Sequence, residues 1–154
     1  MICEFRFSTD NNITLAGARS DISSPKAVVQ IIHGAKEHKE RYYEFMDWLA
    51  GIGFASVITD NRGHGSSITE EYSLGYMDGW ETIVSDQALL TDFIRKEWTD
   101  TPVYLFGHSF GSLLARCYLE KHDYMIDKLI LSGTVGYRPE SRIAIALADI
   151  IMLF

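Results

Sequence analysis

The sequence predicts an α/β protein with a mostly parallel β-sheet and helices on both faces. Nearly continuous apolar runs rich in β-branched residues recur along the chain, as they do in strands that are covered on both faces. Between these runs lie amphipathic segments whose apolar residues are spaced three and four apart, which is the pattern of a helix. Strands that alternate with helices form βαβ units with right-handed crossovers, so we expect the 154 residues to fold as one domain.

The N-terminal segment predicts a β-hairpin. Residues 2–8 alternate between apolar and polar side chains, which is typical of a half-buried strand. Asp10-Asn11-Asn12 is a turn signal, and residues 13–19 form the expected returning strand. We expect this antiparallel pair at one edge of the sheet.

Four buried strands and their helices follow the hairpin. The apolar runs place these strands at residues 27–32, 54–59, 103–106 and 128–131. The helical spacing predicts helices over 40–51, 80–98 and 110–118, with a long loop rich in Gly, Ser and Asp at 60–78. A further helix is expected from Pro139. It contains the apolar segment 143–154, which is shorter than the roughly 20 residues that span a bilayer.

The composition excludes several classes of function. A net charge of −7 and a pI near 5.1 argue against nucleic-acid binding, which needs clustered Lys and Arg. No Gly-rich phosphate loop follows the first buried strand, so we expect no nucleotide or other cofactor. Cys3 and Cys117 lack the spacing of a metal or redox motif and are expected to be buried free thiols. Because the N-terminus lacks the form of a signal peptide, we expect a cytoplasmic location.

The motif Gly107-His108-Ser109-Phe110-Gly111 points to nucleophilic catalysis. It follows a buried strand and opens an amphipathic helix, which is the setting of a nucleophile elbow. The serine of such an elbow sits in a strained turn, so the residues two positions before and after it must have no bulky side chain. Gly107 and Gly111 meet this requirement. The helix N-terminus adds positive potential where an oxyanion would form. The alternative is an ordinary strand-to-helix turn with a capping serine.

A second loop fits an oxyanion hole. His33-Gly34-Ala35 follows the first buried strand, and an elbow serine needs two N–H donors, one from such a loop and one from the residue after the nucleophile. We therefore expect the backbone N–H groups of Ala35 and Phe110 to be the donors. Gly34 lets the backbone approach closely. His33 is interpreted as structural, bonding neighbouring loops, and His38 is either a solvated or a functional loop residue.

The segment Asp60-Asn61-Arg62-Gly63-His64-Gly65-Ser66 ends the next strand and is interpreted as scaffold. We expect Asp60 and Arg62 to pair and to hold this loop beside the site. His64 is not spaced from any Cys, His or carboxylate as a metal ligand would be, so no metal site is predicted.

These three blocks together resemble the monoacylglycerol lipase and lysophospholipase group of α/β-hydrolases, which grades into the serine aminopeptidases. The likeness lies in residues 33–38 with Arg41-Tyr42, in residues 60–66 and in residues 107–112. Lys36 departs from the pattern, since these lipases usually carry glycine there. The resemblance implies an α/β-hydrolase fold, of which this sequence covers about the first half, with about six strands. Residues 1–138 would form the N-terminal part of the core, and residues 139–154 would begin the cap region.

The resemblance also implies a reaction. Family members cleave carboxylic esters of monoacylglycerols, lysophospholipids or small acyl substrates through an acyl-enzyme on the serine, using Ser, Asp and His in that chain order. After Ser109 the sequence offers one histidine, His122, about 20 Å along the same helix. That distance excludes His122 as the general base. Asp123, Asp127 and Asp149 have no histidine to orient, so the triad Asp and His are expected outside this sequence.

Three readings of function remain open. The first is an acyl-ester hydrolase that is inactive as these 154 residues alone. The second is a non-catalytic half-domain or interaction module that another chain completes. The third is an acyltransferase or aminopeptidase on the same fold. In each case the strand at 128–131 would present a sheet edge, so we expect self-association or a complementing chain there. We expect no nucleic acid and no integral membrane segment as partners.

Overall fold

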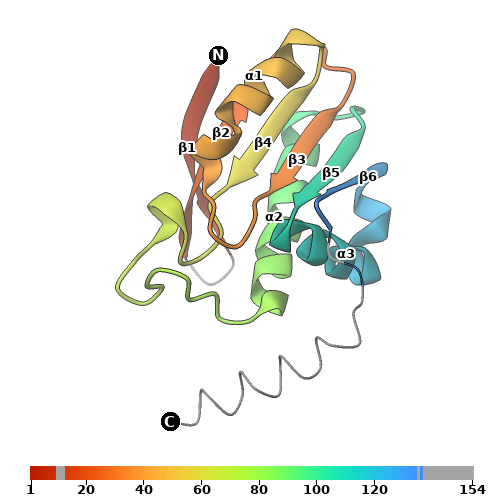
Figure 1. Cartoon of the computed structure of the whole chain (residues 1–154). Coiled ribbons are helices and arrows are strands. Elements are labelled where there is room, and N and C mark those ends of the chain that lie inside the picture. Colours follow the sequence, from red (N-terminus) through yellow and green to blue (C-terminus); the bar gives the residue numbers. More distant parts are fainter. Residues whose placement is uncertain (10–12, 135, 137–154) are drawn as a thin grey trace, which may run out of the picture.

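One sheet of six strands forms the centre of the computed structural model, which describes residues 1–9, 13–134 and 136 (Figure 1). The strand order is β1-β2-β4-β3-β5-β6. The strands are β1 (Ile2–Ser8), β2 (Thr14–Ser20), β3 (Val28–Ile32), β4 (Ala55–Thr59), β5 (Val103–His108) and β6 (Lys128–Ser132). The helices are α1 (Tyr43–Gly51), α2 (Trp80–Glu97) and α3 (Phe110–His122), with short 3-10 turns at Lys39–Tyr42, Gly65–Ser67 and Asp123–Met125. The predicted helix from Pro139 and the proposed cap residues 139–154 lie outside the described residues.

The N-terminal hairpin lies at one edge of the sheet, as the sequence predicted. β1 pairs antiparallel with β2, with Ile2 opposite Ser20 and Ser8 opposite Thr14. β2 also pairs antiparallel with β4, so the hairpin adds to a parallel set made by β4, β3, β5 and β6. The predicted mostly parallel α/β sheet is therefore confirmed.

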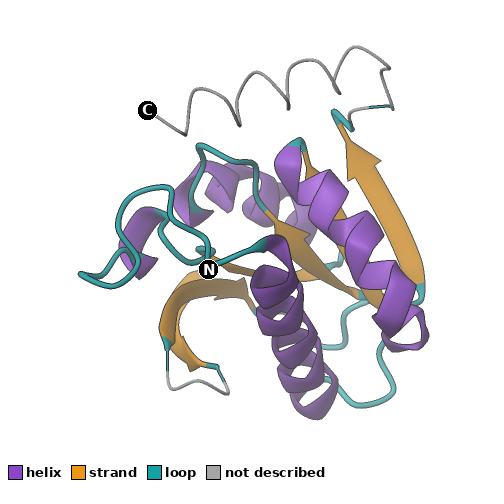
Figure 2. Ribbon diagram, turned by 90° about the horizontal axis from the view of Figure 1, so that it is seen from below, coloured by secondary structure: helices purple, strands orange, loops and turns teal. Residues whose placement is uncertain are grey.

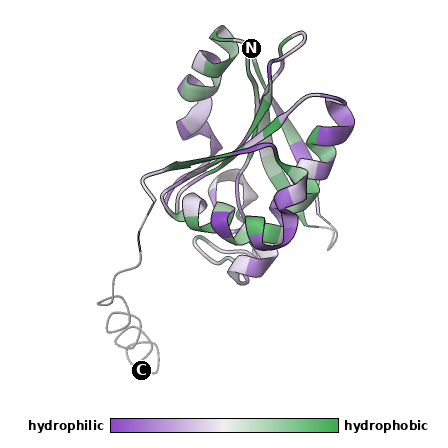
Figure 3. Ribbon diagram, turned by 90° about the vertical axis from the view of Figure 1, so that its right-hand side faces the viewer, coloured by the Kyte–Doolittle hydropathy of each residue, from purple (hydrophilic) through white to green (hydrophobic). Residues whose placement is uncertain are grey.

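Helices cover both faces of the sheet (Figure 2). α1 packs on one face, where Met46 and Leu49 contact Val29 and Ile31 of β3 and Ile58 of β4. α2 and α3 pack on the other face against the alternate strand residues, including Val28, Ile32 and Leu105. In Figure 3 the hydrophobic colour runs along the strands, whereas the helices alternate between hydrophobic and hydrophilic residues. The core therefore has two layers, one on each side of the sheet.

Two element boundaries differ from the sequence prediction. The helix expected over 40–51 starts as a 3-10 turn and becomes α-helical only at Tyr43. Here the backbone N–H of Lys39 donates to Asp60 Oδ1 at 2.6 Å, a tertiary contact that no local pattern reveals. β5 continues two residues beyond Phe106 because Gly107 and His108 pair with Leu131 and Ser132 of β6. A Gly-His pair carries little strand signal by itself.

The described part of the chain leaves one region of the sheet without a helix. β6 pairs only with β5 there, so its outer edge is unpaired. On the α1 side, Phe106 of β5 lies opposite Ile130 of β6, and Ile130 remains 41% exposed. This edge and face are the features on which the association prediction depends.

Candidate active site

Ser109 sits between the end of β5 and the start of α3 in an unusual backbone conformation. Its φ is 51° and its ψ is −118°, and positive φ in a non-glycine residue costs on the order of 1–3 kcal/mol. The surrounding bonds hold this conformation. The Ser109 N–H donates to the Ser132 carbonyl of β6 at 2.9 Å, and the Ser109 carbonyl accepts from the Ser112 N–H at 3.0 Å and its hydroxyl at 2.6 Å. The strained turn therefore has specific partners in the sheet and the helix.

The glycines on either side of Ser109 are sterically required. A Cβ on Gly107 would overlap the carbonyl oxygen of Gly111, and a Cβ on Gly111 would overlap the carbonyl oxygen of Ile32 in β3. The start of α3 thus lies directly against the end of β3. Any side chain at these two positions would push the helix, and Ser109 with it, away from the sheet.

The loop after β3 passes beside Ser109. A Cβ placed on Gly34 would lie 3.4 Å from Ser109 Cβ and 2.8 Å from Glu37 Oε2. Neither the Ala35 N–H nor the Phe110 N–H has a hydrogen-bond acceptor among the residues that the structure describes. These two N–H groups are therefore not used by other residues there, and their role as oxyanion donors stays a prediction.

His33 is buried and bonds two loops together. Its Nε2 accepts the Asn61 N–H at 2.9 Å, so the proton lies on Nδ1, which donates to the Gly34 carbonyl at 2.8 Å. Burial lowers the pKa of His33 from 6.5 to about 4, so the ring is neutral at pH 7. This arrangement agrees with the structural interpretation of His33.

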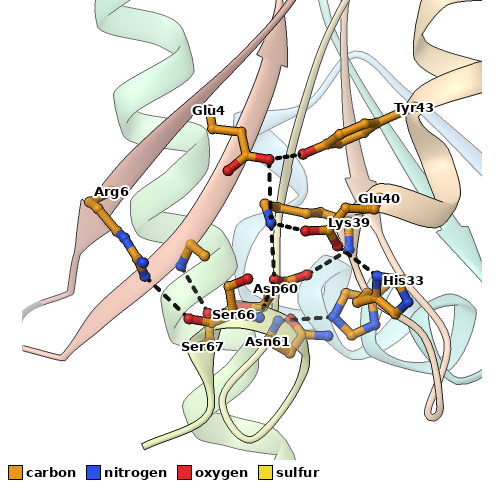
Figure 4. A network of polar contacts seen from close by, with 12 residues as sticks. Glu4, Arg6, His33, Lys39, Glu40, Tyr43, Asp60, Asn61, Ser66 and Ser67 are labelled. Atoms are coloured by element: carbon orange, nitrogen blue, oxygen red, sulfur yellow. Dashed lines mark hydrogen bonds and ion pairs between the residues drawn. The ribbon is translucent and has the colours of Figure 1, made fainter.

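Asp60 does not pair with Arg62, contrary to the expectation from sequence. Asp60 instead accepts the N–H groups of Lys39 at 2.6 Å and Ser66 at 2.8 Å, and lies 3.6 Å from the Lys39 ammonium (Figure 4). Arg62 donates to both carboxylate oxygens of Asp86 in α2, at 2.7 and 2.9 Å. Asp60 and Arg62 therefore have different partners, Asp60 in the loops that follow β3 and β4 and Arg62 in α2. The predicted pair is therefore wrong, and the scaffold role of the segment stays a prediction that these other contacts are compatible with.

The two cations are held in their charged forms. The hydrogen bond with Asp86 raises the pKa of Arg62 above its usual range, although burial opposes it. Burial alone would lower the pKa of Lys39, but its contacts with Glu40, Asp60 and Glu4 raise it overall. Figure 4 shows that Glu4 of β1 and Asp60 at the end of β4 approach the Lys39 ammonium from two strands. The Lys39 side chain is 1% exposed, and its contacts with Glu4 and Asp60 connect the hairpin to the loop after β4.

The contacts that Glu37 and His64 make with the loop after β3 were not predicted from the sequence. Glu37 Oε2 accepts the Gly34 N–H at 2.8 Å and the Tyr42 hydroxyl at 2.6 Å. Burial would raise the pKa of Glu37, but these two bonds lower it below its ordinary value. His64 Nε2 lies 2.6 Å from the Ala35 carbonyl. Both residues lie in sequence segments that resemble the lipase family, Glu37 in 33–38 and His64 in 60–66. Their spacing along the chain did not show which groups they would bond.

Among the described residues after Ser109, no acid or histidine forms a hydrogen bond with its side chain. Asp127 Oδ2 accepts the N–H of Val103, at the opposite end of β5 from Ser109. His122 ends α3, and its Nδ1 has no hydrogen-bond partner among the described residues. His38 is half exposed and pairs with Glu40 at 2.6 Å. In the described part of the chain no hydrogen bond joins the Ser109 hydroxyl to a base, and Asp149 lies outside it.

A cleft of about 260 Å³ lies on the α1 side of the sheet, and its lining includes His108, the residue before Ser109. Its lining consists of Glu37, Arg41, Tyr42, Phe45, Phe106 and His108. The lining thus combines three aromatic side chains with the charged residues Glu37 and Arg41. Such a surface can hold a small amphipathic molecule.

Two further findings concern cysteines and metals. Cys3 is exposed and Cys117 is partly exposed, so the expectation of buried thiols is wrong for Cys3. Cys3 lies on β1, whose outer side is the edge of the sheet. No cluster of three His, Cys, Asp or Glu side chains suited to a metal ion occurs among the described residues.

Comparison with known proteins gives consistent results. The family model described as serine aminopeptidase, S33, matches residues 23–152. The monoglyceride lipase of Mus musculus is 32% identical over 119 residues, covering 77% of this chain and 38% of that protein. The human monoglyceride lipase is 31% identical with the same coverage. The chain therefore spans less than half the length of these relatives.

Solved structures agree in fold. A thermostable carboxyl esterase from Bacillus coagulans, in complex with glycerol, superposes with a TM-score of 0.83 at 30% identity, covering 98% of this chain and 50% of that one. A soluble variant of monoglyceride lipase from Saccharomyces cerevisiae superposes with a TM-score of 0.81 at 21% identity, covering 97% of this chain and 50% of that one. Within the described residues, no helix has the length and apolar character needed to cross a membrane.

Proposed function

The chain belongs to the α/β-hydrolase family that the serine aminopeptidase (S33) model describes, and from this premise we propose that it supplies the nucleophile and oxyanion hole of a carboxylic ester hydrolase. The observation that carries this proposal is the strained Ser109, placed between β5 and α3 with the Gly34 loop beside it. Strain of this kind persists where the surrounding structure fixes it, and such positions cluster at active sites.

In the proposed reaction, the Ser109 oxygen attacks the ester carbonyl carbon while a general base accepts the proton of the serine hydroxyl. The carbonyl oxygen becomes an anion and accepts hydrogen bonds from the N–H groups of Ala35 and Phe110. The C–O bond to the alcohol then breaks, the protonated base gives its proton to the departing alcohol oxygen, and an acyl group is left on Ser109. Water then attacks this acyl-enzyme while the base takes one of its protons. The C–O bond to Ser109 breaks, the base returns the proton to the serine oxygen, and the carboxylic acid is released. The positive N-terminal end of α3 favours the same anion.

The general base of this reaction is proposed to lie outside the described residues. A base must come within about 3 Å of the serine hydroxyl, or one water further. His122 stands at the far end of α3, and Asp127 caps the far end of β5. We therefore expect these 154 residues alone to hydrolyse p-nitrophenyl esters far below the roughly 10 s⁻¹ of a typical enzyme.

The proposed substrates are monoacylglycerols, lysophospholipids or small acyl esters. The mouse and human relatives are monoglyceride lipases, a relative in Haemophilus influenzae is a probable lysophospholipase, and the Bacillus coagulans structure holds glycerol. The aromatic cleft, whose lining includes the residue before Ser109, fits an acyl or glyceryl group. Aminopeptidase or acyltransferase chemistry would use the same serine, with an amide substrate or with an alcohol in place of water.

Three other expectations stay proposals. Residues 1–138 are proposed as the N-terminal part of the hydrolase core and residues 139–154 as the start of the cap. Self-association or a complementing chain at the edge of β6 is proposed from its unpaired outer side. A cytoplasmic location stays a prediction from the sequence.

A fluorophosphonate probe tests the nucleophile. We expect the unchanged chain to take up one probe at Ser109, at a low rate because no base contacts the hydroxyl. Ser109→Ala should take up none, while the matched control Ser23→Ala, at an exposed serine remote from the site, should label normally. Peptide mass spectrometry locates the adduct. An adduct on another serine would count directly against the assignment.

A further inference from the structure

Three consecutive peptide groups beside Ser109 are each bonded by a side chain. The Gly34 N–H donates to Glu37 Oε2 at 2.8 Å, and the Gly34 carbonyl accepts from His33 Nδ1 at 2.8 Å. The next carbonyl, that of Ala35, lies 2.6 Å from His64 Nε2. His64 comes from the loop after β4, whereas the other residues come from the loop after β3. One long-range contact therefore joins these two loops at Ala35.

These bonds determine where the Ala35 N–H points. In a trans peptide the C=O of one residue and the N–H of the next point in opposite directions. Holding the Gly34 carbonyl therefore orients the Ala35 N–H, and holding the Ala35 carbonyl fixes the peptide plane on the other side of the same Cα. With both planes fixed, Ala35 has little freedom in φ or ψ, and its N–H keeps one direction.

His64 is itself held firmly. The side chain is 4% exposed, and its Nδ1 lies 2.9 Å from the Arg62 carbonyl. Arg62 is anchored to Asp86 of α2. The ring also lies 5.2 Å, centroid to centroid, from that of His33. Both ring nitrogens of His64 face a carbonyl oxygen, and a neutral imidazole carries one proton. We place that proton on Nε2, where the contact is shorter, so that Nε2–H donates to the Ala35 carbonyl.

We propose that His64 is a positioning residue for the oxyanion hole: its Nε2–H holds the Ala35 carbonyl and so keeps the Ala35 N–H directed at the developing anion. This inference rests on the proposed esterase function, because it assigns His64 a task in that reaction. His64 does not touch the substrate and acts through Ala35. A donor works only when it lies 2.7–3.1 Å from the oxyanion, so a small rotation of this peptide weakens the site.

The test compares three variants in fluorophosphonate labelling of Ser109, with the maximal rate and the half-saturating probe concentration measured separately. His64→Leu removes the donor and should lower the maximal rate about 10- to 100-fold with little change in half-saturation. His64→Gln keeps an N–H donor and should recover part of the loss. His38→Leu removes a half-exposed histidine from the neighbouring loop and should leave both values unchanged. Thermal unfolding confirms that each variant is folded.

The contact is also tested apart from the chemistry. A scalar coupling between His64 ¹⁵Nε2 and the Ala35 carbonyl ¹³C is expected in the unchanged chain. Absence of this coupling would overturn the inference whatever the labelling shows. An unchanged labelling rate in folded His64→Leu would overturn it as well. If the unchanged chain takes no label at Ser109 but the coupling is present, the proposed esterase function fails, and with it the task assigned to His64.

Discussion

Ser109 and His33 illustrate how single residues depend on their surroundings in this fold. Ser109 holds φ at 51° because three backbone or side-chain bonds from β6 and α3 fix it. His33 is neutral because burial penalises its charged form, and both ring nitrogens are used by the loops on either side. Neither state is a property of the isolated residue. The backbone conformation of Ser109 and the neutral ring of His33 both depend on the loops that meet at the carboxyl ends of the parallel strands.

The pKa of His33 predicts a pH dependence of stability. Burial lowers the pKa of His33 in the folded state to about 4, below its ordinary value of 6.5, so the unfolded chain binds the proton more tightly. His33 therefore contributes fully to stability above pH 6.5, and this contribution is lost as the pH falls from 6.5 toward 4. The expected loss is at most about 3 kcal/mol in the free energy of unfolding. Urea unfolding at pH 7 and pH 4.5 measures it.

A variant separates His33 from the carboxylates that titrate in the same range. His33→Gln has no titrating ring, so its stability should fall less steeply between pH 7 and pH 4.5 than that of the unchanged chain. His38→Gln is the control, because His38 is half exposed, and should keep the original slope. Equal slopes for all three proteins would contradict the assignment of His33 as buried and neutral.

At the scale of elements, α2 is joined to the sheet by buried polar groups as well as by apolar packing. Gln30 in the middle of β3 donates to the Gln87 carbonyl and side chain of α2, both at 2.9 Å. Thr91 donates to Gln30 Oε1 at 2.7 Å and accepts the Tyr118 hydroxyl of α3 at 2.8 Å. This chain of bonds runs from the sheet through α2 to α3. It fixes the register of both helices on that face.

Thr91→Val should break this chain of bonds. Valine has nearly the same shape but leaves Gln30 Oε1 and the Tyr118 hydroxyl without this partner in a buried setting. We expect a loss of about 1–3 kcal/mol in the free energy of unfolding, measured by urea titration. Thr99→Val, at an exposed site, should change it by less than about 0.5 kcal/mol.

A double-mutant cycle checks the pairwise contact. If the bond between Thr91 and Tyr118 matters, the losses for Thr91→Val and Tyr118→Phe should sum to more than the loss of the double variant. Strictly additive losses would show that the two side chains do not interact in solution.

At the scale of the whole molecule, β6 forms one of the two outer edges of the sheet in the described residues, and β1 forms the other. β6 pairs on one side only within the described residues, and Ile130 is 41% exposed next to the aromatic cleft. Unpaired strand edges with apolar side chains tend to pair with another chain. These features favour association through β6.

Ile130→Lys should weaken this association. A lysine on the edge strand opposes strand pairing between chains, so sedimentation velocity should show a shift toward the 17.5 kDa monomer. Ile68→Lys is the matched control, because Ile68 is 43% exposed in the loop after β4, and it should leave the distribution unchanged. A monomer at high micromolar concentration for the unchanged chain, with cooperative unfolding, would contradict the association prediction.

The sequence by itself determined the elements and the place of the candidate nucleophile. Alternating and continuous apolar patterns are local signals, so they located the hairpin, the buried strands and the helices to within a few residues. The glycine requirements at Gly107 and Gly111 could also be predicted, because a tight turn between a strand and a helix has the same steric demands in any protein.

Only the tertiary structure decided the partners of the polar residues. Asp60 bonds Lys39 and Arg62 bonds Asp86, at separations of 21 and 24 residues, although Asp60 and Arg62 are near neighbours in sequence. His64 likewise meets Ala35 from 29 residues away. The order of the strands brings these loops together at the carboxyl edge of the sheet. Pairing there depends on the three-dimensional direction of each side chain, which no local periodicity encodes.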